Sequence, residues 1–268
     1  MLQPPDKSVP LISVISPARD ASRFYDDWLH TLLAQDYPRL EVFLVDDGSE
    51  DGDMPSGLRA RSRSAPGFVE YLRLEGVGPA SARNHALRQA RGEYVAFLDL
   101  DDRWTPGHLH RLADALNADT GAGIAQGYIR KFLIADDGRA YFCSEPYRFV
   151  NLGAALYRRE VFDSCGLFDE DLHFGEDFDY ILRCWENGIR RIDVPEVSLL
   201  YQRHERNMTN GKSVVDLGAV RCFKRRLDRM RSGQVDPSIV EQRRVSFADY
   251  MGRTAGPFDE GVREAVEW

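Results

Sequence analysis

Short apolar runs alternate with helical periodicity through the N-terminal part of the chain. A short apolar run bounded by polar turn residues is typical of a buried strand, whereas apolar residues recurring every three or four positions are typical of a helix. Strands that alternate with helices predict an α/β fold with a mostly parallel sheet covered on both faces. The predicted strands are 11–16, 40–45, 68–74 and 94–98, and the predicted helices are 25–33 and 80–90.

The pattern changes after residue 120. Two apolar runs flank Asp136-Asp137-Gly138, which predicts a β-hairpin. Helices and short strands follow, then a basic, partly amphipathic helix, and the tail to Trp268 has weak periodicity. The predicted elements are the hairpin strands 124–133 and 139–142, the helices 158–163, 177–187 and 214–230, and the strands 192–194 and 198–201.

Two predicted strands run directly into clusters of acids. Strand 40–45 is followed by Asp46-Asp47-Gly48-Ser49, and strand 94–98 by Asp99-Leu100-Asp101-Asp102. In a parallel sheet both clusters project into the crevice at the carboxyl ends of the strands. Neighbouring carboxylates repel each other unless a cation relieves them, and Mg²⁺ or Mn²⁺ prefers carboxylate and phosphate oxygens. The alternative is a pair of ligand-free turns, because Asp, Gly and Ser favour turns.

Two further segments allow competing interpretations. Acids at 176, 177 and 179 open a predicted helix, where they stabilise the helix dipole or supply a general base for a hydroxyl. Segment 76–81 looks like a dinucleotide-binding turn. That interpretation is disfavoured, because Pro79 removes a backbone N–H that phosphate binding needs and the turn follows the third strand.

Composition narrows the class of protein. Hydrophobic residues make up 43% of the 268 residues and the net charge is −8, which indicates a globular enzyme or binding protein and no nucleic-acid partner. Four cysteines without a CxxC pair, and the lack of a signal or membrane-spanning run, predict a cytoplasmic protein. The basic segment 221–231 allows peripheral contact with anionic lipid, or is simply a solvated helix face.

Taken in order, these segments resemble the family 2 glycosyltransferases, which have the GT-A fold. The resemblance extends from about residue 10 to 210, and the order and spacing of the motifs make it specific. The matching segments are 11–19 (LISVISPAR), 46–49 (DDGS), 78–94 (GPASARN followed by RGEY), 97–102 (FLDLDD) and 166–180 (GLFDE followed by EDFDY).

The resemblance implies a role for each matching position. Asp177 would be the catalytic base, with Glu176 beside it orienting the acceptor. Asp101 would bind a Mn²⁺ or Mg²⁺ ion together with Asp99. His204 would complete that shell or touch the diphosphate, although a lone loop histidine is as often structural. The residues implied to contact the nucleotide sugar are Pro17, Arg19, Asp46, Asp47, Arg83, Asp99 and Leu100.

The resemblance also implies an architecture. A Rossmann-like, mostly parallel sheet flanked by helices would carry a small β element on the acceptor side and a C-terminal helical appendage. The nucleotide-sugar half would be 1–120, the acceptor and catalytic-base half 121–212, and the appendage 213–268.

The implied reaction is inverting transfer of a sugar from a nucleotide diphosphate, with UDP expected, to a saccharide or a lipid-linked glycan. Two alternatives stay open. A sugar nucleotidyltransferase would need a glycine-rich basic loop after the first strand, whereas segment 16–20 has no glycine. A non-catalytic binding protein of the same fold would bind the donor without releasing sugar. Oligomeric state is left open by the sequence.

Overall fold

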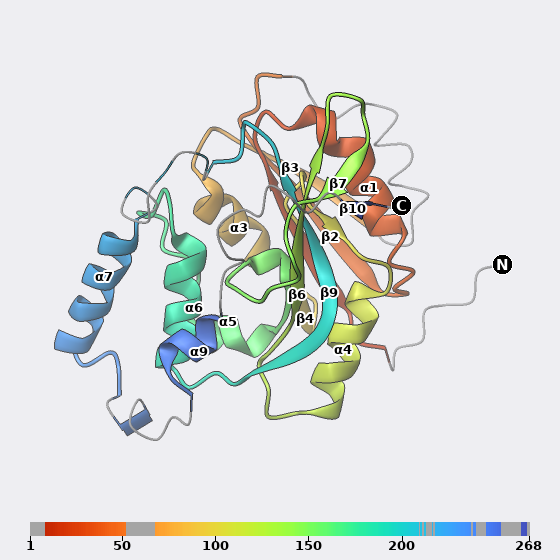
Figure 1. Cartoon of the computed structure of the whole chain (residues 1–268). Helices are drawn as coiled ribbons and strands as arrows, with labels where there is room; N and C mark the ends of the chain where they lie inside the picture. The colour runs from red at the N-terminus through yellow and green to blue at the C-terminus, as the bar shows by residue number, and fades with distance from the viewer. Residues whose placement is uncertain are drawn as a thin grey trace.

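The computed structural model describes residues 9–51, 68–208, 210, 212, 216, 218–236, 238–239, 245–252 and 264–266. One ten-stranded mixed sheet runs through the molecule, with helices packed on both of its faces (Figure 1). The order along the main path is β10-β7-β6-β8-β4-β1-β2-β3. Strands from the predicted nucleotide-sugar half and the predicted acceptor half therefore belong to the same sheet.

The parallel part of the sheet matches the sequence prediction closely. Strand β1 (Ile12–Ala18) is central and lies between β2 (Leu40–Asp47) and β4 (Tyr94–Phe97), and β3 (Phe68–Leu74) lies outside β2. All three strand pairs are parallel. The ends of β2 and β4 therefore meet at one edge of the sheet, on either side of the end of β1.

Helices cover the two faces as the alternation of strand side chains requires. Ile12 and Val14 of β1 face one core, and Ile15 faces the other. On the first face pack α1 (Tyr25–Leu33) and α4 (His108–Ala118). On the second pack α3 (Pro79–Leu87), α5 (Arg159–Cys165) and α6 (Glu176–Glu186).

The second half of the sheet is mixed. Strand β6 (Ile124–Ile134) forms the expected hairpin with β7 (Ala140–Phe142) through a turn in which Gly138 has φ 79°. Strand β8 (Ala155–Arg158) is antiparallel to both β4 and β6. Strand β9 (Arg191–Arg203) runs parallel to β6 with register shifts near Tyr128, and it pairs with the two-residue β5 (Arg103–Trp104).

One sequence prediction needs correction here, and two elements were missed. The strands 192–194 and 198–201 are one strand, β9, whose bulged register absorbs Pro195. Strand β8 and helix α4 were not predicted. Two short 3₁₀ turns, Ser22–Phe24 and Leu152–Ala154, complete the connections.

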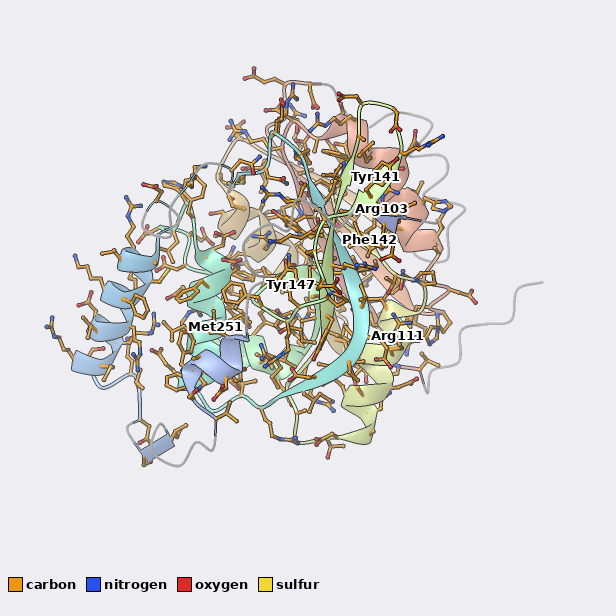
Figure 2. All side chains as sticks on the ribbon, viewed as in Figure 1. Arg103, Arg111, Tyr141, Phe142, Tyr147 and Met251 are labelled. Atoms are coloured by element: carbon orange, nitrogen blue, oxygen red, sulfur yellow. The ribbon has the colours of Figure 1, made fainter. Side chains whose placement is uncertain are left out.

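The C-terminal segment is only partly helical. Helix α7 (Ala219–Arg231) begins later than the predicted helix 214–230, whose residues 214, 215 and 217 lie outside the described part. Helix α9 (Phe247–Met251) places Met251 in the core beside α6 (Figure 2). Strand β10 (Glu264–Ala265) then pairs with β7. No helix within the described ranges is long and apolar enough to cross a membrane.

Two of the matching motifs hold the fold together. The N–H of Gly92 donates to Ser13 Oγ at 2.8 Å, and a Cβ at this position would lie 2.4 Å from that oxygen, so only glycine fits. Asn84 on α3 donates to Phe168 O at 2.9 Å and to Glu170 Oε1 at 2.8 Å, and it accepts from Phe168 N. The ARN motif therefore positions the FDE segment that precedes α6.

Candidate active site

Three carboxylates follow β4 and have few partners. Asp102 is 2% exposed, and its carboxylate accepts the N–H of Gln202 at 3.2 Å. Burial raises its pKa well above the usual carboxyl range, and the charges of Asp101 and Asp99 raise it further. Burial likewise raises the pKa of Asp99, against the lowering effect of Arg83. This end of the sheet therefore has an excess of negative charge.

A loop after β9 supplies the histidine. His204 Nε2 lies 2.9 Å from Asp101 Oδ2, and its ring packs 5.3 Å from that of Phe24. The N–H of Arg206 donates to His204 Nδ1 at 3.2 Å, which favours the tautomer in which Nε2 donates to Asp101. His204 must give up that proton before Nε2 can bind an ion.

Asn207 completes this loop and was missed in the sequence. It is 7% exposed, its Oδ1 accepts from His204 N at 2.7 Å, and its Nδ2 donates to Gln202 O at 3.1 Å. The same Nδ2 lies 3.5 Å from Asp101 Oδ2. Asparagine favours turns because its side chain bonds nearby backbone groups, and its place in the polar run after His204 is the signal that could have identified this position.

Arg83 connects the end of β4 to the start of α6. Its guanidinium donates to Glu176 Oε1 at 2.8 Å and to Asp99 Oδ1 at 3.1 Å. The Arg83 side chain is 7% exposed and that of Glu176 is 12% exposed, so this ion pair is shielded from water, whereas the Asp99 side chain is 46% exposed. Sequence resemblance implies that Arg83 contacts the nucleotide; in this structure its two observed partners are carboxylates.

Asp177 lies beside this arginine at the N-terminus of α6. Burial raises the pKa of Asp177 to about 6, and the neighbouring charge of Glu176 raises it too, while the N–H of Phe178 and Arg83 act in the opposite direction. The carboxylate accepts the Phe178 N–H at 2.6 Å. A carboxylate with a pKa close to neutrality is suited to removing a proton from a hydroxyl.

The two aspartates after β2 have a different environment. Asp46 is fully buried and accepts from Ser49 N at 2.8 Å, from Arg73 Nη1 at 2.7 Å and from the Tyr71 hydroxyl. Asp47 is 4% exposed, and its two oxygens accept the N–H groups of Val77 and Gly78 at 2.7 and 2.8 Å. Asp46 therefore fixes the turn after β2 against β3, and Asp47 fixes the loop that precedes α3.

The remaining predicted donor contacts lie at the same edge of the sheet. Pro17 pairs with Val45 near the end of β1. Arg19 is exposed, and its guanidinium lies beside Gly76, where an added Cβ would be 3.4 Å from Arg19 Nη1. The Leu100 side chain is in the hydrophobic core, so only its backbone can reach a donor. Their contacts with a nucleotide sugar stay predictions.

Most of the predicted site residues are therefore linked through space. Asp47 holds the loop before α3, α3 carries Arg83, and Arg83 binds Asp99 and Glu176. Asp101 then contacts His204. Within the described ranges, no group of three or more His, Cys, Asp or Glu side chains is arranged to hold a metal ion.

Comparison with known proteins identifies this arrangement. The family model described as glycosyl transferase family 2 matches residues 13–142, which include the acid clusters after β2 and β4 and the arginine between them. Residues 13–142 of the chain match glycosyltransferase family 2. TuaG of Bacillus subtilis, whose name refers to teichuronic acid biosynthesis, is 38% identical over 129 residues, which are 48% of this chain and 50% of TuaG.

Solved structures extend the similarity beyond the segment that the family model matches. TarS of S. aureus in complex with UDP-GlcNAc has a TM-score of 0.60 at 23% identity, over 76% of this chain and 62% of that chain. The mannosyltransferase PcManGT of Pyrobaculum calidifontis, in complex with GDP-Man and Mn²⁺, has a TM-score of 0.59 at 26% identity. The match covers 76% of this chain and 60% of PcManGT. The fold is GT-A, as the sequence predicted.

The match to the curated relatives is partial in length. The uncharacterized glycosyltransferase EpsJ of Bacillus subtilis is 26% identical over 225 residues, which cover 75% of this chain and 63% of EpsJ. The chain spans about half to two thirds of the length of these relatives.

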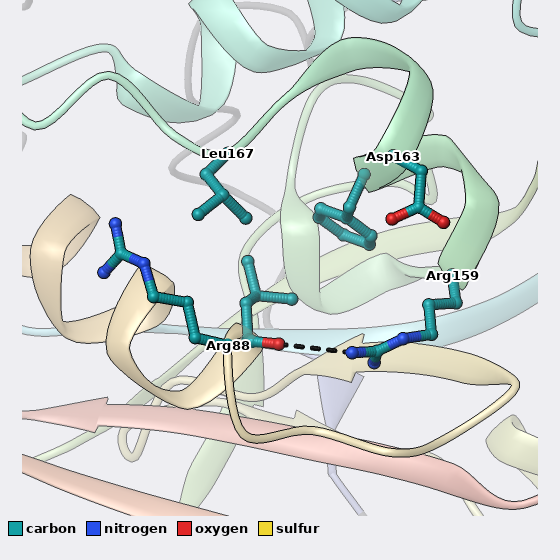
Figure 3. Close-up of a pocket in the computed structure, with 6 residues that line it drawn as sticks. Arg88, Arg159, Asp163 and Leu167 are labelled. Atoms are coloured by element: carbon teal, nitrogen blue, oxygen red, sulfur yellow. Dashed lines mark hydrogen bonds between the residues drawn. The ribbon is translucent and has the colours of Figure 1, made fainter.

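A pocket elsewhere in the chain is separate from the acids. It lies between the end of α3 and helix α5, where Arg159 donates to Leu87 O at 3.5 Å (Figure 3). None of its lining residues belongs to the predicted site. They are Leu87, Arg88, Arg159, Phe162, Asp163 and Leu167.

Proposed function

We propose that this chain is an inverting glycosyltransferase that moves a sugar from a nucleoside-diphosphate donor, UDP first among the candidates, to an acceptor hydroxyl in polysaccharide or glycoconjugate synthesis. One observation carries the proposal. Arg83 joins the start of α6, with its base candidate Asp177, to Asp99 at the end of β4. A base and a cluster of anionic ligands on adjacent elements are what displacement at an anomeric carbon requires.

The proposed chemistry uses one proton acceptor. Asp177 takes the proton of the acceptor hydroxyl while that oxygen forms a bond to the anomeric carbon. The bond from this carbon to the diphosphate oxygen breaks on the opposite face, and the nucleoside diphosphate leaves with the bonding electron pair. Glu176 holds Arg83 at 2.8 Å and so keeps the cationic side chain beside the base.

The residues after β4 fit a hard divalent ion. Asp101 is 27% exposed at its side chain, and burial together with the charges of Asp101 and Asp99 raises the pKa of Asp102. Mg²⁺ and Mn²⁺ sites commonly combine one or two carboxylates with substrate phosphates. Asp101 would hold the ion, with Asp99 and a deprotonated His204 Nε2 available beside it. A bound ion would neutralise the departing diphosphate.

The decisive experiment is a donor panel in Mn²⁺. UDP-, GDP- and dTDP-sugars are scored by thermal shift, and nucleotide release is then followed with each donor that binds. A ligand at 100 times its dissociation constant stabilises the folded state by about 2.7 kcal/mol, which a melting curve resolves. We expect one nucleotide class to raise the melting temperature and to be released slowly in water.

Each alternative has its own outcome. A chain that binds the nucleotide sugar but releases no nucleotide, with or without saccharide acceptors, is a binding protein. Release of pyrophosphate from a nucleoside triphosphate and a sugar 1-phosphate indicates a nucleotidyltransferase. If no donor in the panel changes the melting temperature, the assignment of the acid clusters to a nucleotide sugar is wrong.

A further inference from the structure

Helix α7 attaches to the protein through its charged side. Three of its arginines point toward α6 and the loop before it, where they meet carboxylates that are buried or partly buried, apart from the exposed Asp171. Asp179 and Glu186, on the receiving face of α6, are each only 1% exposed at the side chain. The ion pairs are Arg225 with Asp169 (3.0 Å) and Asp171 (2.7 Å), Arg226 with Glu186 (3.2 Å), and Arg229 with Asp179 (3.0 Å) and Glu186 (2.8 Å).

The apolar side of α7 is largely exposed, although the Phe223 ring also packs edge-on against Phe178 of α6, with 6.0 Å between the ring centroids. Val220, Phe223, Leu227 and Met230 recur at helical spacing, and they are 61%, 46%, 50% and 50% exposed. An amphipathic helix of a globular protein normally turns such a stripe toward the core. Of the ten large hydrophobic side chains that are exposed among the described residues, six lie between residues 220 and 245. On α7 the apolar side chains are therefore exposed to solvent, and the exposed apolar side chains of the described residues are concentrated on this helix and shortly after it.

Basic side chains border this stripe. Arg221, Lys224 and Arg231 are exposed, and the structure shows no ion-pair partner for them among the residues it describes. Lys224 and Arg231 each follow a member of the stripe by four residues, so they lie along its edge. This local positive charge contrasts with the net charge of −8 for the whole chain.

We propose that this outer face of α7, formed by the four apolar residues and these three cations, docks on an anionic lipid surface. Apolar side chains on one helix face enter the headgroup boundary, while the long basic side chains keep their charges among lipid phosphates. Helix α7 lies at the outer edge of the molecule, on the far side of α6 from the sheet (Figure 1). A protruding helix of this kind can lie flat on a membrane.

The start of α7 contacts the segment that precedes the proposed base. The Cys222 thiol lies 3.4 Å from Gly175 O, and a Cβ on Gly218 would lie 2.5 Å from Phe174 O. Gly175 immediately precedes Glu176 and Asp177. A docked α7 therefore holds the base close to the headgroups. Taken together with the proposed function, on which this step rests, the geometry favours a lipid-linked acceptor over a free saccharide.

Co-sedimentation of the whole chain with vesicles tests the docking. One vesicle is phosphatidylcholine alone, and the other is phosphatidylcholine mixed with phosphatidylglycerol. We expect partition onto the mixed vesicles, little partition onto the neutral ones, and weaker binding as salt is raised. Equal partition onto both vesicles, or none onto either, overturns the proposal.

Two variants with a matched control locate the binding face. Lys224→Gln with Arg231→Gln should lower partition by about 25-fold, at about fivefold for each cation removed. Leu227→Ala with Met230→Ala should lower it by about tenfold or more. The control, Ile134→Ala with Arg139→Gln, removes an exposed apolar and an exposed cationic side chain from the β6–β7 hairpin and should change nothing.

Folding and enzymatic activity are read separately. All the substituted side chains are exposed, so melting curves of the variants should match the parent. Donor hydrolysis in solution should also be unchanged, because none of these residues is in the proposed site. Vesicle binding with no hydrolysis would leave the docking face standing and remove the proposed function. Self-association through the same residues, without vesicle binding, would assign the face to a second copy and overturn the lipid proposal.

Discussion

The two acid clusters have similar sequences and opposite electrostatic environments. Asp46, after β2, has partners for both carboxylate oxygens, and its pKa is lowered by hydrogen bonds from Tyr71 and Ser49 and by the charge of Arg73, despite burial. Asp102, after β4, has one weak backbone donor and a raised pKa. The first cluster is satisfied by the protein and fixes a loop. The second has an excess of negative charge that a substrate complex can use.

The difference comes from what lies beside each strand end. Strand β3 runs alongside β2 and brings Tyr71 and Arg73 to Asp46. Strand β4 has β1 and the antiparallel β8 as neighbours, and the one arginine described beside its acids, Arg83, is shared with Glu176. Arg73 of the neighbouring strand β3 balances the charge of Asp46, so the cluster after β2 stabilises the fold. The acids after β4 have no such cation on a neighbouring strand among the described residues, so they are left for a ligand.

The largest effect, a loss of turnover, is expected at Asp177, beside the Arg83 link between the second cluster and α6. Asp177→Asn removes the base and keeps the shape of the side chain, so turnover should fall by about 10²–10⁴-fold. The donor affinity should be unchanged, because the asparagine removes no ligand of the nucleotide. Single-turnover rates and calorimetric affinities for the donor measure the two quantities separately. Turnover equal to that of the parent would exclude Asp177 as the base.

A smaller loss, in nucleotide affinity, should distinguish the roles of the two acid clusters directly. Asp101→Ala should lower the nucleotide affinity in Mn²⁺ by about 100-fold and leave the metal-free affinity unchanged, since a divalent ion contributes several kcal/mol of charge stabilisation. Isothermal titration with UDP, with and without Mn²⁺, gives both values. The matched change Asp46→Ala should lower both affinities equally, through the displaced loop. If instead Asp101→Ala shows no Mn²⁺-specific loss, the ion is bound elsewhere.

The third test compares the free energy of unfolding of one variant in each acid cluster. Asp46→Asn replaces a fully buried carboxylate that accepts a hydrogen bond from Arg73, and it should lower the free energy of unfolding by about 2–3 kcal/mol. Asp101→Asn should leave it unchanged or raise it slightly, because it relieves repulsion from neighbouring carboxylates. Urea denaturation near neutral pH measures both. Equal losses in the two variants would remove the distinction between the clusters.

The sequence predicted the parallel strands and the common edge for both acid clusters, because buried runs and their polar ends are local features. It could not separate the clusters, since Tyr71 and Arg73 reach Asp46 only through strand pairing. Helix α4 has the expected spacing at Leu109, Leu112 and Leu116 and could have been predicted. Strand β9 was divided in two because Pro195 interrupts its apolar pattern, and only the pairing with β6 shows that it continues.

The site prediction was limited in the same way. Motif order predicted that Asp47, Asp101 and Asp177 share one site, and the structure links Asp99 through Arg83 to Glu176, the neighbour of Asp177. It did not show that Arg83 already has two carboxylate partners, or that Asn207 lies beside Asp101. These contacts join residues that are far apart in the sequence and in different elements. The packing of the sheet and α6 determines them, and no local pattern encodes that packing.

The smallest expected effect is the pH dependence of the proposed base. The pKa of Asp177 is raised to about 6, and the base works only when deprotonated, so kcat/KM should fall about tenfold for each pH unit below 6 and level off above it. Glu176→Gln removes a negative neighbour and should move the midpoint to lower pH, whereas a variant that merely loosens α6 would lower the rate at every pH without moving it. Residual turnover of Asp177→Asn should lack this acid limb. A limb that persists in Asp177→Asn would have to come from the carboxylates after β4, and the functional contrast between α6 and that cluster would then be wrong.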